Sequence, residues 1–210
     1  MIQGSDISQQ SFLVKCKYLE TICVDGGEVQ HLAYHQKRYE RTLEDEESPQ
    51  IFTLRELIEP PKEGRYRCRL LYGADGVCSV SYHPYKKRVT EKLKLIEADS
   101  LEYAKKYANR EALDALFLQK GACDDVLIVK NGYITDTTIA NVAFFDGVRW
   151  FTPREPLLHG TTRARLVEKG FLEQKDILVE DIFEYSQMAL MNAMIDFDII
   201  QNKKIEEIVC

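Results

Sequence analysis

Residues 126–136 have the sequence VLIVKNGYITD, in which two apolar runs are joined by Asn131 and Gly132. Asn-Gly between apolar runs is one of the strongest short hairpin signals, because both residues tolerate the positive φ angles of a tight turn. The pattern therefore predicts two antiparallel strands, the second of which ends at Asp136. Turn and helix-end signals of similar kinds predict the strands and helices before and after this hairpin.

Three further hairpins are predicted where glycine and aspartate stand together between apolar or β-branched runs. Their strand pairs are residues 12–24 with 28–34, 65–72 with 77–82, and 141–145 with 148–151. Helical patterns lie between these hairpins and end at glycine or before proline. The predicted helices cover residues 35–44, 53–58, 100–120 and 161–169, a short helix is capped by Asp181, and residues 188–200 form a buried apolar segment.

Helices and antiparallel strands occur on both sides of residues 98–104, which predicts a mixed α+β fold in two parts. We expect a smaller α+β domain at residues 1–102 and a larger mixed-sheet domain at residues 103–210. Binding sites often form where two such domains meet, so we expect a site at their interface.

The chain has 210 residues, 45% hydrophobic and 30% charged, with a formal net charge of −6. A core of ordinary size is therefore expected, and the negative charge disfavours nucleic acid or an anionic membrane as a partner. The polar start and the absence of a long apolar run predict neither a signal peptide nor a membrane span. Six scattered cysteines predict reduced thiols in the cytoplasm, and the spacing of the four histidines indicates no zinc site.

Lys105 and Lys106 stand near the start of the helix predicted at residues 100–120. The simplest interpretation of either lysine is a solvated charge on a helix face, and helical phase does not separate the two. A desolvated lysine would instead present a nucleophilic amine.

Asp136 and Arg38 are further candidates. An aspartate at a strand end most often caps a turn, but a buried one can pair with a cationic ring nitrogen. Arg38 lies on a charged helix pattern, where an Arg-Glu pair is the plain interpretation, yet its guanidinium also suits bidentate binding of phosphate. Thr161 and Thr162 open a predicted helix after Gly160, either as ordinary capping residues or as a phosphate cradle of backbone N–H groups.

The chain resembles the class IV pyridoxal-phosphate enzymes, which include branched-chain aminotransferases, D-amino-acid aminotransferases and aminodeoxychorismate lyases. Five motifs in the same order carry the resemblance, over about residues 18–194. They are Leu19-Glu20-Thr21-Ile22, His35-x-x-Arg38, Lys106-x-x-Asn109-Arg110, residues 134–142, and Thr152-Pro153 followed by residues 158–163. Asp136 stands where the family more often has glutamate.

The resemblance implies a two-domain D-amino-acid aminotransferase-like fold and pyridoxal 5'-phosphate as cofactor, bound mainly by the larger domain at residues 103–210. It selects Lys106 over Lys105 as the Schiff-base lysine, and it implies that Asp136 faces the pyridine nitrogen. Arg38 and the backbone amides at Thr161 and Thr162 would bind the phosphate. Asn192 and Ala193 are further cofactor-binding candidates, and Arg69 is a candidate for a substrate carboxylate.

Asn192-Ala193 is similar to a stretch found in the lyases of this family. The resemblance therefore implies a 4-amino-4-deoxychorismate lyase, which releases 4-aminobenzoate and pyruvate, as in folate biosynthesis. An amino-acid transaminase of the D-amino-acid or branched-chain type is the alternative, and a non-catalytic relative that serves as an interaction protein is another. The resemblance also implies a homodimer that acts on a small amino substrate.

Overall fold

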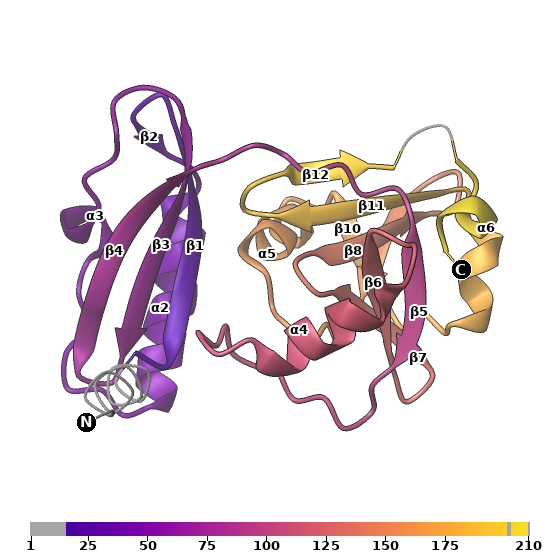
Figure 1. The fold of residues 1–210 in the computed structure, drawn as a ribbon, viewed down its shortest axis with the longest axis horizontal. Coiled ribbons are helices and arrows are strands. Elements are labelled where there is room, and N and C mark those ends of the chain that lie inside the picture. The colour runs from indigo at the N-terminus through magenta and orange to yellow at the C-terminus, as the bar shows by residue number, and fades with distance from the viewer. Residues whose placement is uncertain (1–15, 201–202, 210) are drawn as a thin grey trace, which may run out of the picture. The chain divides into compact units, whose positions relative to one another are not determined.

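The computed structural model describes residues 16–200 and 203–209 (Figure 1). These residues form two compact units, and the chain passes between them more than once. The first unit contains residues 16–86 and 105–109, and the second contains residues 87–104 and 110–209. The domains expected at residues 1–102 and 103–210, and a site at their interface, stay predictions.

The first unit is a four-stranded antiparallel sheet with the strand order β2-β1-β3-β4 and with two helices. The strands are β1 (Tyr18–Asp25), β2 (Glu28–Val29), β3 (Arg65–Gly73) and β4 (Gly76–Pro84), and the helices are α2 (Leu32–Asp45) and α3 (Leu54–Leu57). Alternate residues of β1 and β3 pack against α2 because successive side chains of a strand point to opposite faces. The core includes Tyr18, Ile22, Leu70 and Tyr72 from the strands and Tyr39 and Leu43 from α2.

The return strand predicted at residues 28–34 is wrong in its extent. Pairing with β1 ends at Val29, and α2 already begins at Leu32. His31 precedes the helix with a φ angle of 51°, so the backbone turns sharply there. The amphipathic pattern of α2 therefore extends one turn further back than the sequence indicated.

The helix predicted at residues 100–120 is mostly wrong. The structure has only α4 (Glu111–Phe117), followed by a 3₁₀ turn at Leu118–Lys120. Residues 106–108 instead pair in antiparallel fashion with β1: Leu19 N–H donates to Lys106 C=O at 2.9 Å and Ala108 N–H donates to Lys17 C=O at 2.8 Å. Tertiary pairing with a strand edge thus overrides the local helical pattern.

The second unit is built on a mixed sheet with the order β10-β9-β8-β7-β6-β5, to which β11 adds along β8 and β12 along β11. The β5–β6 and β9–β10 pairs are parallel and the other pairs are antiparallel. Its strands are β5 (Leu93–Glu97), β6 (Asp125–Lys130), β7 (Tyr133–Thr137), β8 (Asn141–Phe145), β9 (Trp150–Pro153), β10 (Leu172–Lys175), β11 (Gln187–Asn192) and β12 (Asp196–Ile199).

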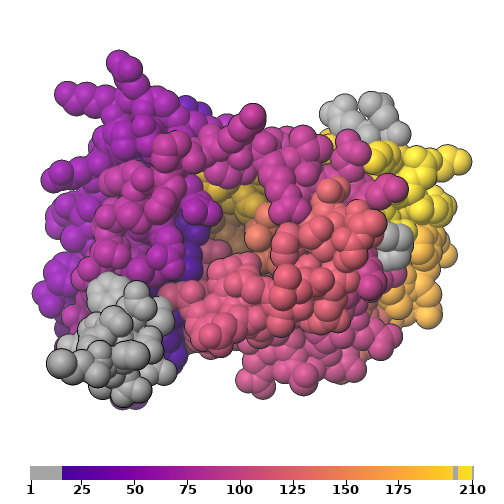
Figure 2. Space-filling view, in the orientation of Figure 1, coloured from indigo at the N-terminus to yellow at the C-terminus, as the bar shows by residue number. Residues whose placement is uncertain are grey.

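Both hairpins predicted at Asn131-Gly132 and Asp146-Gly147 are confirmed. The predicted helix at residues 161–169 is α5 (Thr161–Glu168), and a 3₁₀ turn at Glu180–Glu184 contains Asp181. The apolar segment at 188–200 forms most of the β11–β12 hairpin. In the space-filling view α4, in which only Leu113 is buried, forms part of the visible surface of the second unit (Figure 2).

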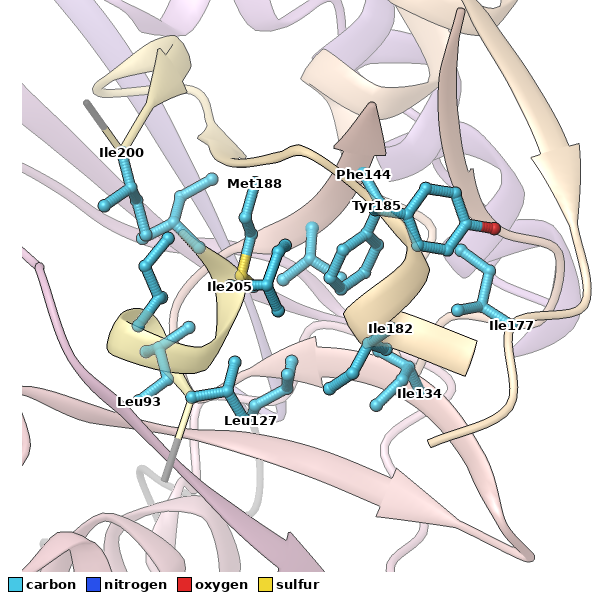
Figure 3. Close-up of a cluster of buried hydrophobic side chains, with 14 of the residues drawn as sticks. Leu93, Leu127, Ile134, Phe144, Ile177, Ile182, Tyr185, Met188, Ile200 and Ile205 are labelled. Carbon is cyan, nitrogen blue, oxygen red and sulfur yellow. The ribbon is translucent and has the colours of Figure 1, made fainter. Parts of the chain in front are cut away.

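The main core of the second unit lies where side chains from the sheet and from α6 (Ile205–Ile208) point toward one another (Figure 3). Leu93 of β5, Leu127 of β6 and Met188 of β11 are fully buried there. Burial of a large apolar side chain contributes about 1.5–3 kcal/mol, so this cluster, which includes Ile134 of β7 and Phe144 of β8, stabilises the sheet.

The cysteines differ from the expectation of reduced thiols. Cys16 and Cys78 form a disulfide with a Cα–Cα distance of 6.0 Å, which ties the residue before Lys17 to β4. Cys23, Cys68 and Cys123 are buried and lie outside this disulfide. Across residues 16–200 and 203–209, no helix has the length and apolar character that a membrane crossing requires.

Candidate functional site

A buried cluster of three ionisable side chains lies between β1 and α2 in the first unit. Arg38 donates from Nε to Glu20 Oε1 at 2.7 Å and from Nη2 to Glu20 Oε2 at 2.5 Å. His35 Nδ1 lies 2.6 Å from Glu20 Oε2. Spacing of three residues places His35 and Arg38 on one face of α2, so both reach the same carboxylate.

The charge of Glu20 depends on the balance between burial and its two basic neighbours. Burial by itself would raise the pKa of Glu20, but the charge of Arg38 and the hydrogen bonds from His35 and Arg38 outweigh it and lower the pKa to about 2. Burial lowers the pKa of His35, so the imidazole is neutral at pH 7 and Nδ1–H is the donor to the carboxylate. Arg38 thus forms the Arg-Glu pair of its plain interpretation, but the pair is buried and its glutamate is Glu20 of β1.

The backbone pairing of residues 106–108 separates the two neighbouring lysines. Tyr107 packs its ring on Tyr18, with ring centroids 5.5 Å apart. Lys105 forms ion pairs with Asp45 and Glu46 at 3.4 and 3.3 Å. Tyr107 N–H donates to Lys105 C=O at 3.0 Å, so the backbone turns tightly at Lys106. The charge of Lys106 also helps to lower the pKa of His35, which places it near the Glu20–His35–Arg38 cluster.

Asp136 lies near the end of β7 in the second unit and is held by neutral donors. Asn141, its direct cross-strand neighbour on β8, donates from Nδ2 to Asp136 Oδ1 at 2.8 Å. The backbone N–H of Leu158 donates to Oδ2 at 2.9 Å. Only 4% of Asp136 is exposed, so the carboxyl group is cut off from solvent.

The pKa of Asp136 follows from this environment. Burial raises it to about 7, although the hydrogen bonds from Asn141 and Leu158 and the charge of Arg163 act to lower it. An acid that is half ionised near neutral pH binds a cation readily, because the cation supplies the charge compensation that burial has removed.

The segment before α5 approaches Asn141 very closely. A Cβ atom on Gly160 would lie 1.9 Å from Asn141 Oδ1, so only glycine fits there. Gly160 is the N-cap of α5, and no side chain caps the first turn. Backbone N–H groups in a first turn lack partners within the helix, which makes the start of α5, at Thr161 and Thr162, chemically suited to an anion.

Arg163 has a structural role in the same segment. Its Nη2 donates to Pro153 C=O at 2.7 Å and to Gln174 Oε1 at 3.0 Å, so the side chain ties α5 to the ends of β9 and β10. This buried arginine is the last residue of the motif at residues 158–163, and it fixes the position of the first turn of α5.

The remaining candidates, Arg69, Asn192 and Ala193, lie on other strands and turns. Arg69 is on β3, opposite Thr21 of β1 and Ser81 of β4, and burial and the charge of Arg67 lower the pKa of its guanidinium. Asn192 ends β11, where its Oδ1 accepts the N–H groups of Met194 and Ile195, and Ala193 is in the same turn. These bonds close the β11–β12 hairpin, and a cofactor role for Asn192 and Ala193 stays a prediction.

The structure thus groups the candidates within each unit. Lys106 and Arg38 belong to the first unit, and Asp136 and the start of α5 belong to the second. Sequence reasoning gave no role to Glu20 or Asn141, which hold Arg38 and Asp136 respectively. A charged residue between Leu19 and the β-branched Thr21 and Ile22 was the available signal for Glu20. Asn141 offered none beyond its place in the resemblance.

The chain belongs to the class IV aminotransferase family, because the sequence profile described as amino-transferase class IV matches residues 18–201. It is 36% identical over 181 residues to an uncharacterized protein of Haemophilus influenzae. The aligned residues cover 83% of this chain and 96% of that protein. The solved structure of a "putative 4-amino-4-deoxychorismate lyase" from Haemophilus somnus is 33% identical. It has a TM-score of 0.79 and covers 85% of this chain and 96% of the other.

The fold extends to more distant relatives. The 4-amino-4-deoxychorismate lyase of Pseudomonas aeruginosa has a TM-score of 0.68 at 16% identity and covers 88% of this chain and 82% of its own. The predicted α+β fold, with an N-terminal antiparallel sheet and a larger mixed C-terminal sheet, is confirmed by these similarities.

Members of this family are pyridoxal-phosphate-dependent lyases and aminotransferases. Three features of this chain are chemically compatible with that cofactor. Asp136 is a buried acid suited to a cationic ring nitrogen. The first turn of α5 follows a glycine that leaves no room for a Cβ. Arg38 is held in a fixed orientation by Glu20.

Proposed function

We propose that this protein is a pyridoxal-phosphate-dependent enzyme that acts on a small amino compound. The observation that carries the proposal is the buried Asp136, fixed by Asn141 and Leu158 and with a pKa of about 7. A buried acid held only by neutral donors is costly for a fold to keep, and a cationic ligand explains it.

When bound, the cofactor supplies an electron-withdrawing ring that stabilises negative charge on the substrate carbon. In the proposal, Asp136 keeps the ring nitrogen protonated, while Arg38 and the N–H groups of Thr161 and Thr162 bind the phosphate. Lys106 would hold the cofactor through its ε-amine, and the same amine would act as the general base that moves the proton at the substrate carbon. Arg69 is the proposed partner of a substrate carboxylate.

Within this class we favour a 4-amino-4-deoxychorismate lyase, which releases 4-aminobenzoate and pyruvate. The 33% identity to the Haemophilus somnus structure supports this choice, as does the Asn192-Ala193 stretch. An amino-acid transaminase is the second candidate, because solved structures described as aminotransferases share the fold. A cytoplasmic location, a homodimer and a role in folate biosynthesis remain parts of the proposal.

Product analysis tests the proposed reaction. The full chain, supplied with pyridoxal phosphate, is incubated with 4-amino-4-deoxychorismate, and in parallel with amino acids and 2-oxoglutarate. Release of 4-aminobenzoate, lost in Lys106→Ala and retained in Lys105→Arg, is the expected result. Glutamate formation would establish the transaminase instead. A protein that remains colourless with the cofactor and forms neither product would favour a non-catalytic relative.

A further inference from the structure

We propose that Asn141 is a positioning residue that holds the Asp136 carboxylate and the segment before α5 in one arrangement, so that the carboxylate can face a cationic ring. The inference rests on the proposed function for the identity of that ring. The arrangement itself lies entirely within the second unit.

The hydrogen bonds around Asn141 form a closed set. Its Nδ2 donates both to Asp136 Oδ1 and to Leu158 C=O, each at 2.8 Å. Leu158 N–H in turn donates to Asp136 Oδ2 at 2.9 Å. An amide NH₂ group has two hydrogens, so Asn141 uses both of them in this set. The carboxylate is thereby held at both oxygens.

Gly160 extends the set toward α5. Asn141 Oδ1 occupies the space where a Gly160 Cβ would lie, at 1.9 Å. The same side chain therefore contacts the partner proposed for the ring nitrogen and the residue before the helix proposed to bind phosphate. Its position on β8, in direct register with Asp136 on β7, is fixed by the sheet. One amide thus sets the relative position of two groups that the proposed cofactor needs.

The charge balance explains why an amide is required. Asp136 is buried, and the charged residue that acts on it is Arg163 on α5, whose nitrogens donate to Pro153, Arg154 and Gln174. The Asn141 hydrogen bond is the largest of the influences that lower the pKa of Asp136 against burial. Without it, the neutral acid would prevail at pH 7 and could not balance a ring cation.

The first test is a titration of the full chain without cofactor. The pKa of Asp136 is measured by carboxyl-carbon NMR in the wild type, in Asn141→Ala and in Thr135→Val. Loss of a hydrogen bond to a charged group should raise the pKa by about one to two units in Asn141→Ala. Thr135→Val is the matched control, because Thr135 is buried on the same strand and donates to Ile128 C=O at 2.8 Å. An unchanged pKa in Asn141→Ala would overturn the proposal.

The second test separates positioning of the acid from general support of the fold. Binding of pyridoxal phosphate is compared with binding of its analogue in which a C–H group replaces the ring nitrogen. Asn141→Ala should weaken binding of pyridoxal phosphate about ten-fold more than binding of the analogue, because only the former needs the ionised acid. Equal losses for both ligands would show a merely structural role and contradict the proposal.

A titration of the wild type alone tests the inference even if a variant fails to fold or the proposed function is wrong. In the wild type, the side-chain N–H signals of Asn141 should titrate with the same midpoint as the Asp136 carboxyl carbon, and independent midpoints would overturn the inference. If the wild type binds neither ligand, the proposed function fails, while the carboxyl titration still decides whether Asn141 holds Asp136 ionised.

Discussion

Glu20 in the first unit and Asp136 in the second are both buried carboxylates with a hydrogen bond at each oxygen, yet their pKa values move in opposite directions. Glu20 is paired with Arg38, and its pKa is about 2. Asp136 is bound by an amide side chain and a backbone N–H, and its pKa is about 7. Hydrogen bonds alone therefore do not decide the charge of a buried acid, whereas a bound cation does.

The comparison assigns different tasks to the two regions. The first cluster carries its own counter-charge, so Glu20 orients Arg38. The second region contains Asp136, and none of its described hydrogen bonds comes from a cation. This environment fits an acid whose counter-charge is supplied by a bound ligand. Each of the following predictions changes one side of this comparison, beginning with the largest expected effect.

Glu20→Gln should destabilise the protein most. It leaves the buried guanidinium of Arg38 without its counter-charge, and breaking a buried ion pair costs about 3–5 kcal/mol. Urea unfolding of the full chain measures the loss. Glu173→Gln is the matched control, because it breaks an exposed pair with Arg149 and should cost about 1 kcal/mol or less. A loss in Glu20→Gln no greater than in this control would refute the first half of the comparison.

Loss of the Cys16–Cys78 disulfide should destabilise the first unit by about 2–4 kcal/mol, since the bond closes a long loop in the unfolded chain. The double variant Cys16→Ser, Cys78→Ser is compared with the wild type, each with and without a dithiol. The dithiol should lower the unfolding midpoint of the wild type and leave that of the double variant unchanged. Identical responses would show that the disulfide does not form.

Gly160→Ala should cost about 1–3 kcal/mol, because a new Cβ must displace Asn141 Oδ1 from 1.9 Å. In an Asn141→Ala background the same substitution should cost less, since the side chain that it meets is gone. Unfolding of the four members of this cycle measures the coupling. Strictly additive losses would show that Gly160 and Asn141 do not depend on one another.

The pH dependence of stability should differ in sign for the two acids. The contribution of Glu20, whose folded pKa is lowered, is present above its unfolded pKa and is lost as the pH falls toward about 2. Asp136 has a raised folded pKa, so stability falls as the pH rises from about 4 to about 7, by at most about 1.4 kcal/mol for each pH unit.

Asp136→Asn should flatten the slope between pH 4 and 7. Part of the slope should remain, because burial also raises the pKa of Asp125. Unfolding at a series of pH values measures both slopes. A variant with the same slope as the wild type would mean that Asp136 does not titrate in this range.

The sequence predicted elements best where turn chemistry dominates. Asn131-Gly132 and Asp146-Gly147 need positive φ angles or tight turns, and both hairpins formed as predicted. Prediction failed around Lys106, where a local helical pattern was overridden by pairing with β1. Such pairing depends on an available strand edge far away in sequence, which local periodicity does not encode.

Spaced motifs marked Lys106, Arg38 and Asp136 as candidates, and their role in a cofactor site stays a prediction. Their supports were missed, because Glu20 and Asn141 act through contacts between neighbouring elements rather than through a sequence pattern. The Cys16–Cys78 disulfide was missed for the same reason, since its two cysteines are 62 residues apart.

The most direct test of the proposed cofactor site is covalent trapping. The full chain is incubated with pyridoxal phosphate, reduced with borohydride and digested, and the modified peptide is identified by mass spectrometry. We predict a single modification on Lys106, retained in Lys105→Arg and lost in Lys106→Ala. Modification of Lys105, labelling spread over many lysines, or no labelling at all would contradict the account.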